Sequence, residues 1–454
     1  MQGADPRRRR RRRTMPAAAF TAAAIGAAVL AGCSGGSAVG FHFAGAPTVT
    51  IWSWRAQDKA LWTTAQADLA ARGTKVNLDF RAINPTSYDA IVQTAMNGGK
   101  GPDIFYDRAG EGTATYAAAG LIRPLDGVVD TSDISPAALA AAQYRGRTYG
   151  VPFAIQTMAV FYNKTVLSSN GIQPPTTWTG FLGAMSKLKA EGITPMYVMG
   201  VQPWMLGLQI DAIGASTMTD SFTRQLVDRK ADYTAAPYLR TLTAFQQLAP
   251  YLEPDWQATG SDGDEQETAL ALGRCGFVID GVFDTAEFTG VNPNVQLGQI
   301  LVPSPDGGPA RLDWYVDGDI SMNANIGDVA EAAAAQKVIA FTSTPAFGDA
   351  FSATAGEISP IQGTTVPAKY PLAVQDEQWY RSDAIAPVFG IRSPMDTPPP
   401  NVAALKANKS LSAEQGVWTD EQNLAADLLA GKLTPAQMAS RVQGELGWYY
   451  GPSA

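Results

Sequence analysis

The sequence predicts an α/β fold, because strand patterns and helix patterns alternate along its first third. Residues 49–54 and residues 76–80 alternate between apolar and other side chains, as β-strands do. Between them, residues 58–72 place leucine and alanine side chains four positions apart, which is the spacing of one helical face. This order of strand, helix and strand favours a largely parallel sheet with helices packed against it.

A third predicted strand completes this first region. A helix is predicted at residues 88–96, and two glycines end it. A strand follows at residues 101–106 and ends at the pair Asp107-Arg108. Open α/β sheets bind ligands at the carboxyl ends of their strands. Polar and aromatic residues that follow the first and third strands are therefore candidates for a binding site.

A second region begins near residue 149 and also mixes strands with helices. Two of its helices have recognisable starts, because Thr177 is a plausible side-chain cap and Pro435 follows Thr434 in a first helical turn. The other predicted elements of this later part of the chain are strands at residues 159–163 and 276–280 and helices at residues 265–272 and 331–341. A chain of 454 residues has room for two domains or one large two-lobed unit.

The first 33 residues have the features of an export signal. Seven consecutive arginines at residues 7–13 precede a short apolar run at residues 17–30, and small residues follow. The apolar run is too short to span a bilayer as a helix. The ending Leu-Ala-Gly-Cys resembles the lipobox of bacterial lipoproteins, which implies a signal peptide at residues 1–32 and a lipid anchor on Cys33. We expect an exported protein, held at the outer face of the cytoplasmic membrane by a tether at residues 33–47; export by the Sec route or by the twin-arginine route both remain open.

The composition and charge of the chain favour a folded, acidic protein. Hydrophobic residues make up 46% of the sequence and charged residues 17%, which is enough for a large core. Removing residues 1–32 takes away seven arginines and one aspartate, which leaves 27 basic and 41 acidic residues and a net charge of −14. Binding to nucleic acid depends on lysine and arginine contacts with phosphates, so the sequence argues against a nucleic-acid partner.

The cysteines and the histidine exclude several classes of enzyme. Cys275 is the only cysteine besides Cys33, and its apolar neighbours predict a buried, inert thiol. His42 is the only histidine and lies in the predicted tether. The sequence therefore supports neither a histidine-based catalytic triad nor a zinc site, and no cofactor or metal is expected. A glycosidase that uses two carboxylates needs no histidine and stays open as an alternative.

Short motifs along the chain carry a family resemblance. They are GPDI at residues 101–104, YGVP at 149–152, YNK at 162–164, PTTWTGFL at 175–182 and the segment at 267–281. In this order and spacing they resemble motifs of the substrate-binding lipoproteins of ABC importers, the family 1 extracellular solute-binding proteins, which include maltose-binding proteins. The chain departs from the family pattern at Phe283, where relatives have tryptophan, and at Arg274-Cys275-Gly276, where relatives have two small residues and methionine.

The resemblance implies a fold and a set of partners. It implies two α/β lobes of the periplasmic-binding type (type II-like), a ligand cleft between them, a monomer, a carbohydrate ligand and an ABC permease as partner. The three chain crossings between lobes are expected near residues 153–156, 316–320 and 356–360. The expected N-terminal lobe is residues 48–153 plus 318–357, and the expected C-terminal lobe is residues 154–317 plus 358–454.

A sugar site needs polar groups for hydroxyls and flat aromatic rings for the C–H faces of the sugar. Candidates come from loops after strands, from the crossings and from positions that match the family's motifs. They are Trp54, Arg55, Asp58, Asp107, Arg108, Gln156, Gln202, Trp204, Asp280, Phe283, Trp314, Asp317, Gly318, Asp319 and Glu357. Trp204 is the first choice for stacking on a sugar. The pair Asp107-Arg108 matches an Asp-Arg pair that contacts sugar in maltose-binding relatives.

Two alternatives remain at this point. Ordinary packing or a surface ion pair would also explain most of these candidates. Within the same fold, Arg55 and Arg108 in one cleft would suit a carboxylate or phosphate, because guanidinium groups bind such anions with two hydrogen bonds. A glycerol phosphodiester or an acidic sugar would then be the ligand.

Overall fold

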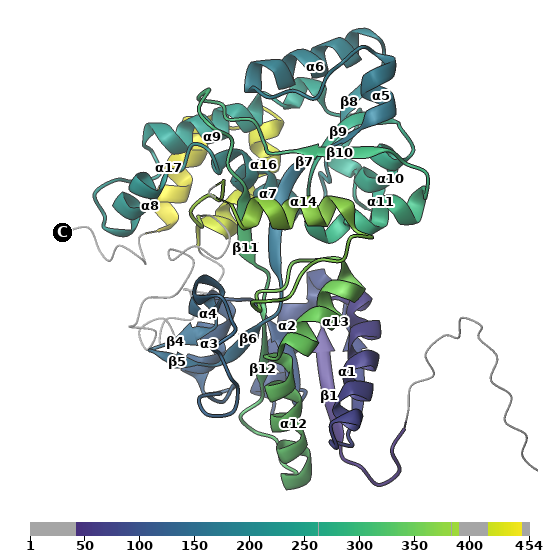
Figure 1. Ribbon diagram of the computed structural model, residues 1–454. Coiled ribbons are helices and arrows are strands. Elements are labelled where there is room, and N and C mark those ends of the chain that lie inside the picture. The colour runs from purple at the N-terminus through teal and green to yellow at the C-terminus, as the bar shows by residue number, and fades with distance from the viewer. Residues whose placement is uncertain (1–41, 262, 383, 390–415, 447–454) are drawn as a thin grey trace, which may run out of the picture. The chain divides into compact units, whose positions relative to one another are not determined.

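The computed structural model describes residues 42–261, 263–382, 384–389 and 416–446 (Figure 1). The predicted signal peptide, Cys33, most of the predicted tether and the proline-rich segment at residues 394–400 lie outside the described residues. None of the helices in the described ranges combines the length and apolar character needed to cross a membrane.

The first sheet contains the predicted parallel strands. Its order is β2-β1-β3-β12-β6, and β1 runs parallel to both β2 and β3, as the alternation of strands and helices predicts. Strand β12 is antiparallel to its neighbours β3 and β6 and comes from much later in the chain. The bounds are β1 Thr48–Ser53, β2 Asn77–Ala82, β3 Ile104–Asp107, β6 Gly150–Pro152 and β12 Asp319–Met322.

Helices and a short hairpin accompany this sheet. They are η1 Ala56–Asp58, α1 Lys59–Ala71, α2 Pro85–Asn97, α3 Glu111–Ala119, α4 Pro136–Ala141, α12 Val329–Thr342 and α13 Pro345–Ala355, with β4 Gln143–Tyr144 and β5 Arg147–Thr148 as the hairpin. Large buried side chains such as Trp62, Phe105 and Tyr106 fill the core between helices and sheet. This core holds the carboxyl ends of β1 and β3 in fixed positions.

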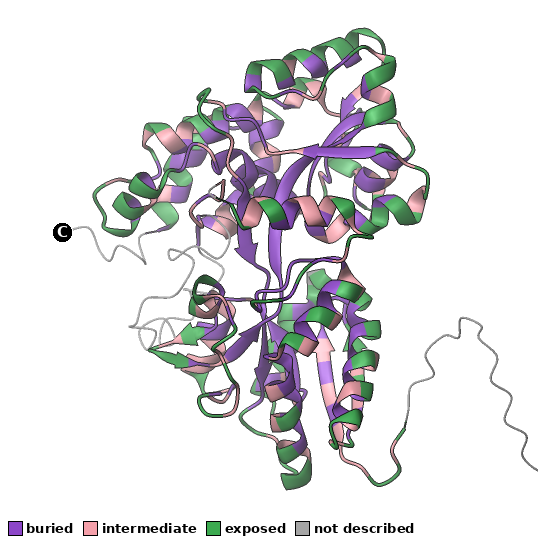
Figure 2. Cartoon of the chain, viewed as in Figure 1, coloured by how far each residue is buried: buried purple, intermediate pink, exposed green. Residues whose placement is uncertain are grey.

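The second sheet is built around one long strand. Its order is β10-β7-β9-β8, with β11 also paired to β7. All nine residues of β7 are buried (Figure 2), so it lacks the alternation that marks a half-exposed strand, and it begins earlier than the predicted residues 159–163. The bounds are β7 Ile155–Asn163, β8 Thr194–Met196, β9 Cys275–Gly281, β10 Leu297–Ile300 and β11 Asp313–Val316.

The predicted helix starts in this region are confirmed. The Thr177 side chain accepts a hydrogen bond from the backbone N–H of Gly180, and Thr434 and Gln437 form a capping box. The helices of the second region are α5 Lys164–Ser169, α6 Trp178–Ala190, α7 Pro203–Gly214, α8 Asp220–Val227, α9 Ala236–Gln246, η2 Ala249–Tyr251, η3 Trp256–Ala258, α10 Glu265–Ala271, η4 Val282–Asp284, α11 Thr285–Val291, α14 Pro371–Tyr380, α16 Val417–Leu429 and α17 Pro435–Glu445. Cys275 is a buried, free thiol, as predicted.

The chain passes between the two sheets at the three predicted crossings. The first lies between β6 and β7, the second between β11 and β12, and the third follows α13. Backbone hydrogen bonds join the three, from Asp317 N–H to the Ala154 carbonyl (3.1 Å) and from Ile155 N–H to the Ile358 carbonyl (2.9 Å). The Pro360 carbonyl of the third crossing also accepts a hydrogen bond from the backbone N–H of Ser135. The exact lobe boundaries remain a prediction.

Candidate ligand-binding site

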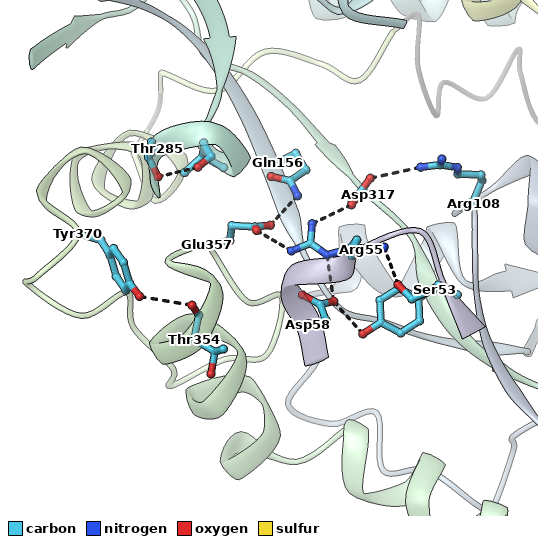
Figure 3. A network of polar contacts seen from close by, with 12 residues as sticks. Ser53, Arg55, Asp58, Arg108, Gln156, Thr285, Asp317, Thr354, Glu357 and Tyr370 are labelled. Atoms are coloured by element: carbon cyan, nitrogen blue, oxygen red, sulfur yellow. Dashed lines mark hydrogen bonds and ion pairs between the residues drawn. The ribbon is translucent and has the colours of Figure 1, made fainter. Parts of the chain in front are cut away.

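A buried arginine lies where the three crossings meet (Figure 3). Arg55 follows β1 and is 3% exposed. Its Nε donates to Asp58 Oδ2 (3.0 Å), Nη1 to Asp317 Oδ2 (3.4 Å) and Nη2 to Glu357 Oε1 (2.5 Å). The Gln156 amide donates to the other Glu357 oxygen (2.7 Å). We call Arg55, Asp58, Gln156, Asp317 and Glu357 the arginine network; it brings together five of the predicted site residues.

The arginine network joins all three crossings through side chains. Gln156 belongs to the first crossing, Asp317 to the second and Glu357 to the third. Burial works against the charge of Arg55, but Asp58, Glu357 and Asp317 outweigh it and hold the Arg55 pKa well above its ordinary value. Burial raises the pKa of Glu357, and the charge of Arg55 opposes that rise. The guanidinium is therefore positively charged and fully committed to protein carboxylates.

Aromatic residues that the sequence analysis did not select surround the arginine network. Tyr106 on β3 donates its hydroxyl to Asp58 Oδ2 (2.9 Å). The rings of Phe153 and Phe351 lie 5.5 and 5.6 Å from the Arg55 guanidinium carbon. Phe153 lies at the first predicted crossing, so its position near the site could have been predicted. Nothing in the local sequence around Phe351 indicates its contact with Arg55.

Arg108 covers the face of Trp54. Its guanidinium carbon lies 3.7 Å from the centre of the Trp54 ring, while Tyr88 and Tyr106 meet that ring edge-on at 5.3 and 5.7 Å. Arg108 also forms long ion pairs with Asp317 (3.8 Å) and Asp89 (3.6 Å), and its side chain is 28% exposed. The structure thus places both Trp54 and Arg108 next to the arginine network.

Asp107, Gly318 and Asp319 lie deeper, between neighbouring strands. Asp107 and Asp319 are register partners on β3 and β12, and both are buried. The Ser321 hydroxyl donates to Asp107 (3.1 Å) and the Thr113 hydroxyl donates to Asp319 (2.7 Å). Burial, reinforced by the nearby Asp319, raises the pKa of Asp107 well above its usual range. A Cβ at Gly318 would collide with the Asp107 carbonyl and with Trp54, so this close approach requires glycine.

A second group of candidates lies in the other region of the fold. The Trp204 indole N–H donates to the Gln202 amide oxygen (3.1 Å), and the Gln202 amide donates to the Gly260 carbonyl (2.9 Å). The rings of Trp204 and Phe283 are 6.1 Å apart. All three predicted residues are only half-buried. We call Trp204 and Phe283 the aromatic pair.

The last two candidates take separate positions. Trp314 is buried; its indole N–H donates to the Ala386 carbonyl (2.9 Å), and its ring meets Tyr380 edge-on at 5.3 Å. These contacts account for Trp314 as packing against α14. Asp280 is fully buried on β9, where it accepts a hydrogen bond from the Gln266 amide (3.0 Å).

Comparison with known proteins identifies the family. The family model described as bacterial extracellular solute-binding protein matches residues 53–348, which span both sheets. The chain belongs to this family. Membership in this family agrees with the two sheets and their helices, with the three crossings and with the order of the sequence motifs.

Individual relatives of this solute-binding protein are distant. The maltotriose-binding protein of Pyrococcus abyssi is 25% identical over 250 residues, which are 51% of each chain. The melibiose/raffinose/stachyose-binding protein MelE of Bacillus subtilis is 22% identical over 84% of this chain and 86% of its own. The chain spans about half the length of the first curated relatives that it matches. Among solved structures, a chitin oligosaccharide binding protein has a TM-score of 0.72 at 20% identity and covers 88% of this chain and 98% of its own.

Proposed function

We propose that this protein binds a carbohydrate, from one sugar unit to an oligosaccharide, and delivers it to an ABC permease. The named ligands of its relatives, maltotriose, the melibiose series and chitin oligosaccharides, support a sugar as the substrate class. The observation that carries the proposal is the aromatic pair. Trp204 and Phe283 are half-buried rings, and the side-chain amide of Gln202 is hydrogen-bonded to Trp204. Aromatic rings stack on the faces of sugars, and a neighbouring amide can bond to their hydroxyls.

A neutral ligand fits the charges better than an anion. Every guanidinium nitrogen of Arg55 already has a carboxylate partner, and the group is 3% exposed. Arg108 shares Asp317 and faces Asp89, so its charge is also opposed. An entering phosphate or carboxylate would meet more negative than positive groups here. Binding of a glycerol phosphodiester or acidic sugar therefore stands second.

The arginine network links the three segments about which the lobes would rotate when the protein closes around a ligand. Lobe closure around a ligand is a known behaviour of periplasmic binding proteins. Arg55 bonds to side chains from the second and third crossings and reaches the first through Glu357. A rotation of one lobe against the other would therefore have to shift these contacts. We propose an open ligand-free form, stacking of the sugar on Trp204, and closure about the network. The closed form would be the one that the permease recognises.

The remaining parts of the proposal concern place and chemistry. Export and a lipid anchor on Cys33 would keep the protein beside its permease, and a monomer suffices for this task. No chemistry on the sugar is proposed. A purified sample that cleaved a chromogenic glycoside would instead support the glycosidase alternative.

Thermal unfolding with a ligand panel tests the proposal. The panel contains mono-, di- and trisaccharides, polyols and glycerol phosphodiesters. A sugar at about a thousand times its dissociation constant stabilises the fold by roughly 4 kcal/mol, which raises Tm by about 4–5 °C for a chain of this length. A shift with a neutral sugar that persists in high salt is expected. A shift limited to anions and lost in salt would favour the second candidate, and no shift with any compound would contradict sugar binding.

A further inference from the structure

Three carboxylates converge next to the aromatic pair. Glu267 lies on α10, Asp280 on β9 and Asp284 on η4, directly after Phe283. One oxygen from each lies within 4.8 Å of the other two. Glu267 and Asp280 are fully buried, and Asp284 is half-buried. We call Glu267, Asp280 and Asp284 the acid triad.

Nothing in the described part of the chain neutralises the acid triad. The ion pairs among the described residues involve none of its three members. Two further acids, Asp264 and Glu287, add to the negative potential around Asp284. Buried carboxylates are normally paired with a cation or coordinate a metal, since an isolated buried charge is very costly. The acid triad therefore lacks a positive partner.

Glu267 points into the triad without a hydrogen-bond donor. Neither of its oxygens accepts a hydrogen bond from a described residue outside the triad, although the side chain is 0% exposed. Asp280 uses one oxygen for the Gly281 backbone N–H (2.7 Å) and the other for the Gln266 amide (3.0 Å), which fixes its orientation. A buried glutamate held against two other carboxyl groups, without a donor from outside the triad, requires a cation or a shared proton between them.

Gln209 is hydrogen-bonded to chain neighbours of the acid triad. Gln209 on α7 donates its amide nitrogen to Gln266 (3.3 Å) and to the Ile279 carbonyl (3.0 Å), which lie beside Glu267 and Asp280 in the chain. The Gln209 amide oxygen is buried and accepts no hydrogen bond from the described residues. The ligand atoms that the acid triad itself offers are carboxylate oxygens, with no histidine nitrogen or cysteine sulfur among them.

We propose that the acid triad is a binding site for a hard divalent cation and that Ca²⁺ is its occupant. Carboxylate and amide oxygens are the ligands that Ca²⁺ and Mg²⁺ prefer, whereas zinc and copper prefer nitrogen or sulfur. Ca²⁺ accepts irregular geometry and several carboxylates, while Mg²⁺ demands an octahedron and keeps most of its water. A triad that converges from α10, β9 and η4 suits the more flexible cation.

The proposed cation would stiffen the segment that carries Phe283. Asp280 and Asp284 flank Val282 and Phe283, and the Phe283 ring packs on Gly281 and lies near Trp204. A cation shared by the two aspartates and Glu267 would lock this turn onto α10. The position of one ring of the aromatic pair would then depend on the cation.

Terbium luminescence tests the site directly, without any sugar. Tb³⁺ binds calcium sites and is excited through nearby tryptophan, and Trp204 is close to the turn that bears Asp284. We expect Tb³⁺ emission that saturates at one equivalent of Tb³⁺ per protein and that falls when Ca²⁺ displaces the bound Tb³⁺. Binding of Tb³⁺ should be at least tenfold weaker in Glu267→Gln and in Asp284→Asn. Glu253→Gln is the matched control, because Glu253 is also a buried acid of this region but lies outside the triad.

Thermal unfolding with Ca²⁺ and with a chelator separates the cation from a shared proton. At a hundred times its dissociation constant, Ca²⁺ should raise Tm of the unaltered protein by about 3 °C. Glu267→Gln should unfold no earlier than the unaltered protein in chelator, since it removes a repulsion, and should gain nothing from Ca²⁺. The proposal is overturned if Ca²⁺ leaves both Tm and Tb³⁺ emission unchanged, if Glu253→Gln weakens binding equally, or if only Mg²⁺ binds.

Discussion

The arginine network and the acid triad each bring three largely buried carboxylates together, but only the network contains a positive charge that neutralises them. In the network, Asp58, Asp317 and Glu357 share one guanidinium at 2.5–3.4 Å. In the triad, no described cation lies within ion-pair distance. Arg55 already neutralises the carboxylates of the network, whereas the carboxylates of the triad need an added cation or proton.

The pKa values express the same contrast. Burial raises the pKa of Glu357, but the charge of Arg55 limits that rise and the carboxylate stays paired with the guanidinium. In the triad, burial and then the neighbouring Asp284 raise the pKa of Glu267 to about 8, because no positive charge opposes them. A buried carboxylate next to a fixed arginine thus contributes to structure, while one without a partner is available for a proton or a metal.

Removing the guanidinium should break the comparison most strongly. Arg55→Ala leaves Asp58, Asp317 and Glu357 buried without their cation, and such a loss costs about 3–5 kcal/mol of unfolding free energy. Urea denaturation measures it. The exposed pair between Arg147 and Asp126 is the control, and Arg147→Ala should cost at most about 1 kcal/mol. Equal losses in the two variants would remove the network from its proposed role.

The sequence predicted the parallel strands and the helix caps because each has a local signal, whereas the three crossings were predicted from the family resemblance. Alternation marks β1, and the side chain of Thr177 marks the start of α6. Arg55 and Asp58 were selected because they follow the first strand. Gln156, Asp317 and Glu357 were selected because the resemblance implies crossings at their positions. The sequence could not show that Arg55 and Glu357 bond to each other across 302 positions.

The acid triad escaped prediction for a related reason. Asp280 was selected from a family motif, but Glu267 reads as one more residue of an acidic helix start. Only the pairing of β7 with β9 and the packing of α10 bring its side chain to Asp280 and Asp284. Long-range contacts decide which acids share a site, and the local sequence carries no record of them.

The aromatic pair offers the next largest effect. Trp204→Ala should weaken binding of the best sugar by about 10- to 100-fold, because a stacked aromatic platform contributes roughly 1–3 kcal/mol. Phe283→Trp enlarges this ring of the aromatic pair and should tighten binding. Isothermal titration measures both. Trp314→Phe is the control, since Trp314 packs on Tyr380; a loss of sugar affinity there but not at Trp204 would place the ligand elsewhere.

Glu267 should give the protein a pH dependence that extends to about pH 8. Glu267 titrates near its ordinary value when unfolded and at about 8 when folded. Between these values the folded state holds more protons, so stability falls as pH rises, by at most about 1.4 kcal/mol per pH unit. Urea denaturation in chelator across this range measures the slope. It should flatten in Glu267→Gln and in the presence of Ca²⁺, and a slope that ignores both changes would assign the dependence to other groups.

Arg108 should show the smallest effect and sharpen the comparison at its edge. Its ion pairs are long, 3.6 and 3.8 Å, and its side chain is partly exposed, so Arg108→Ala should change stability by less than about 1 kcal/mol. The substitution uncovers the face of Trp54, which Arg108 now covers at 3.7 Å. If the ligand is a neutral sugar, affinity should hold or rise, because a second ring becomes available for stacking. A large loss of affinity, greatest at low salt, would instead show that Arg108 holds an anion, and the charge balance of the arginine network would have to be reconsidered.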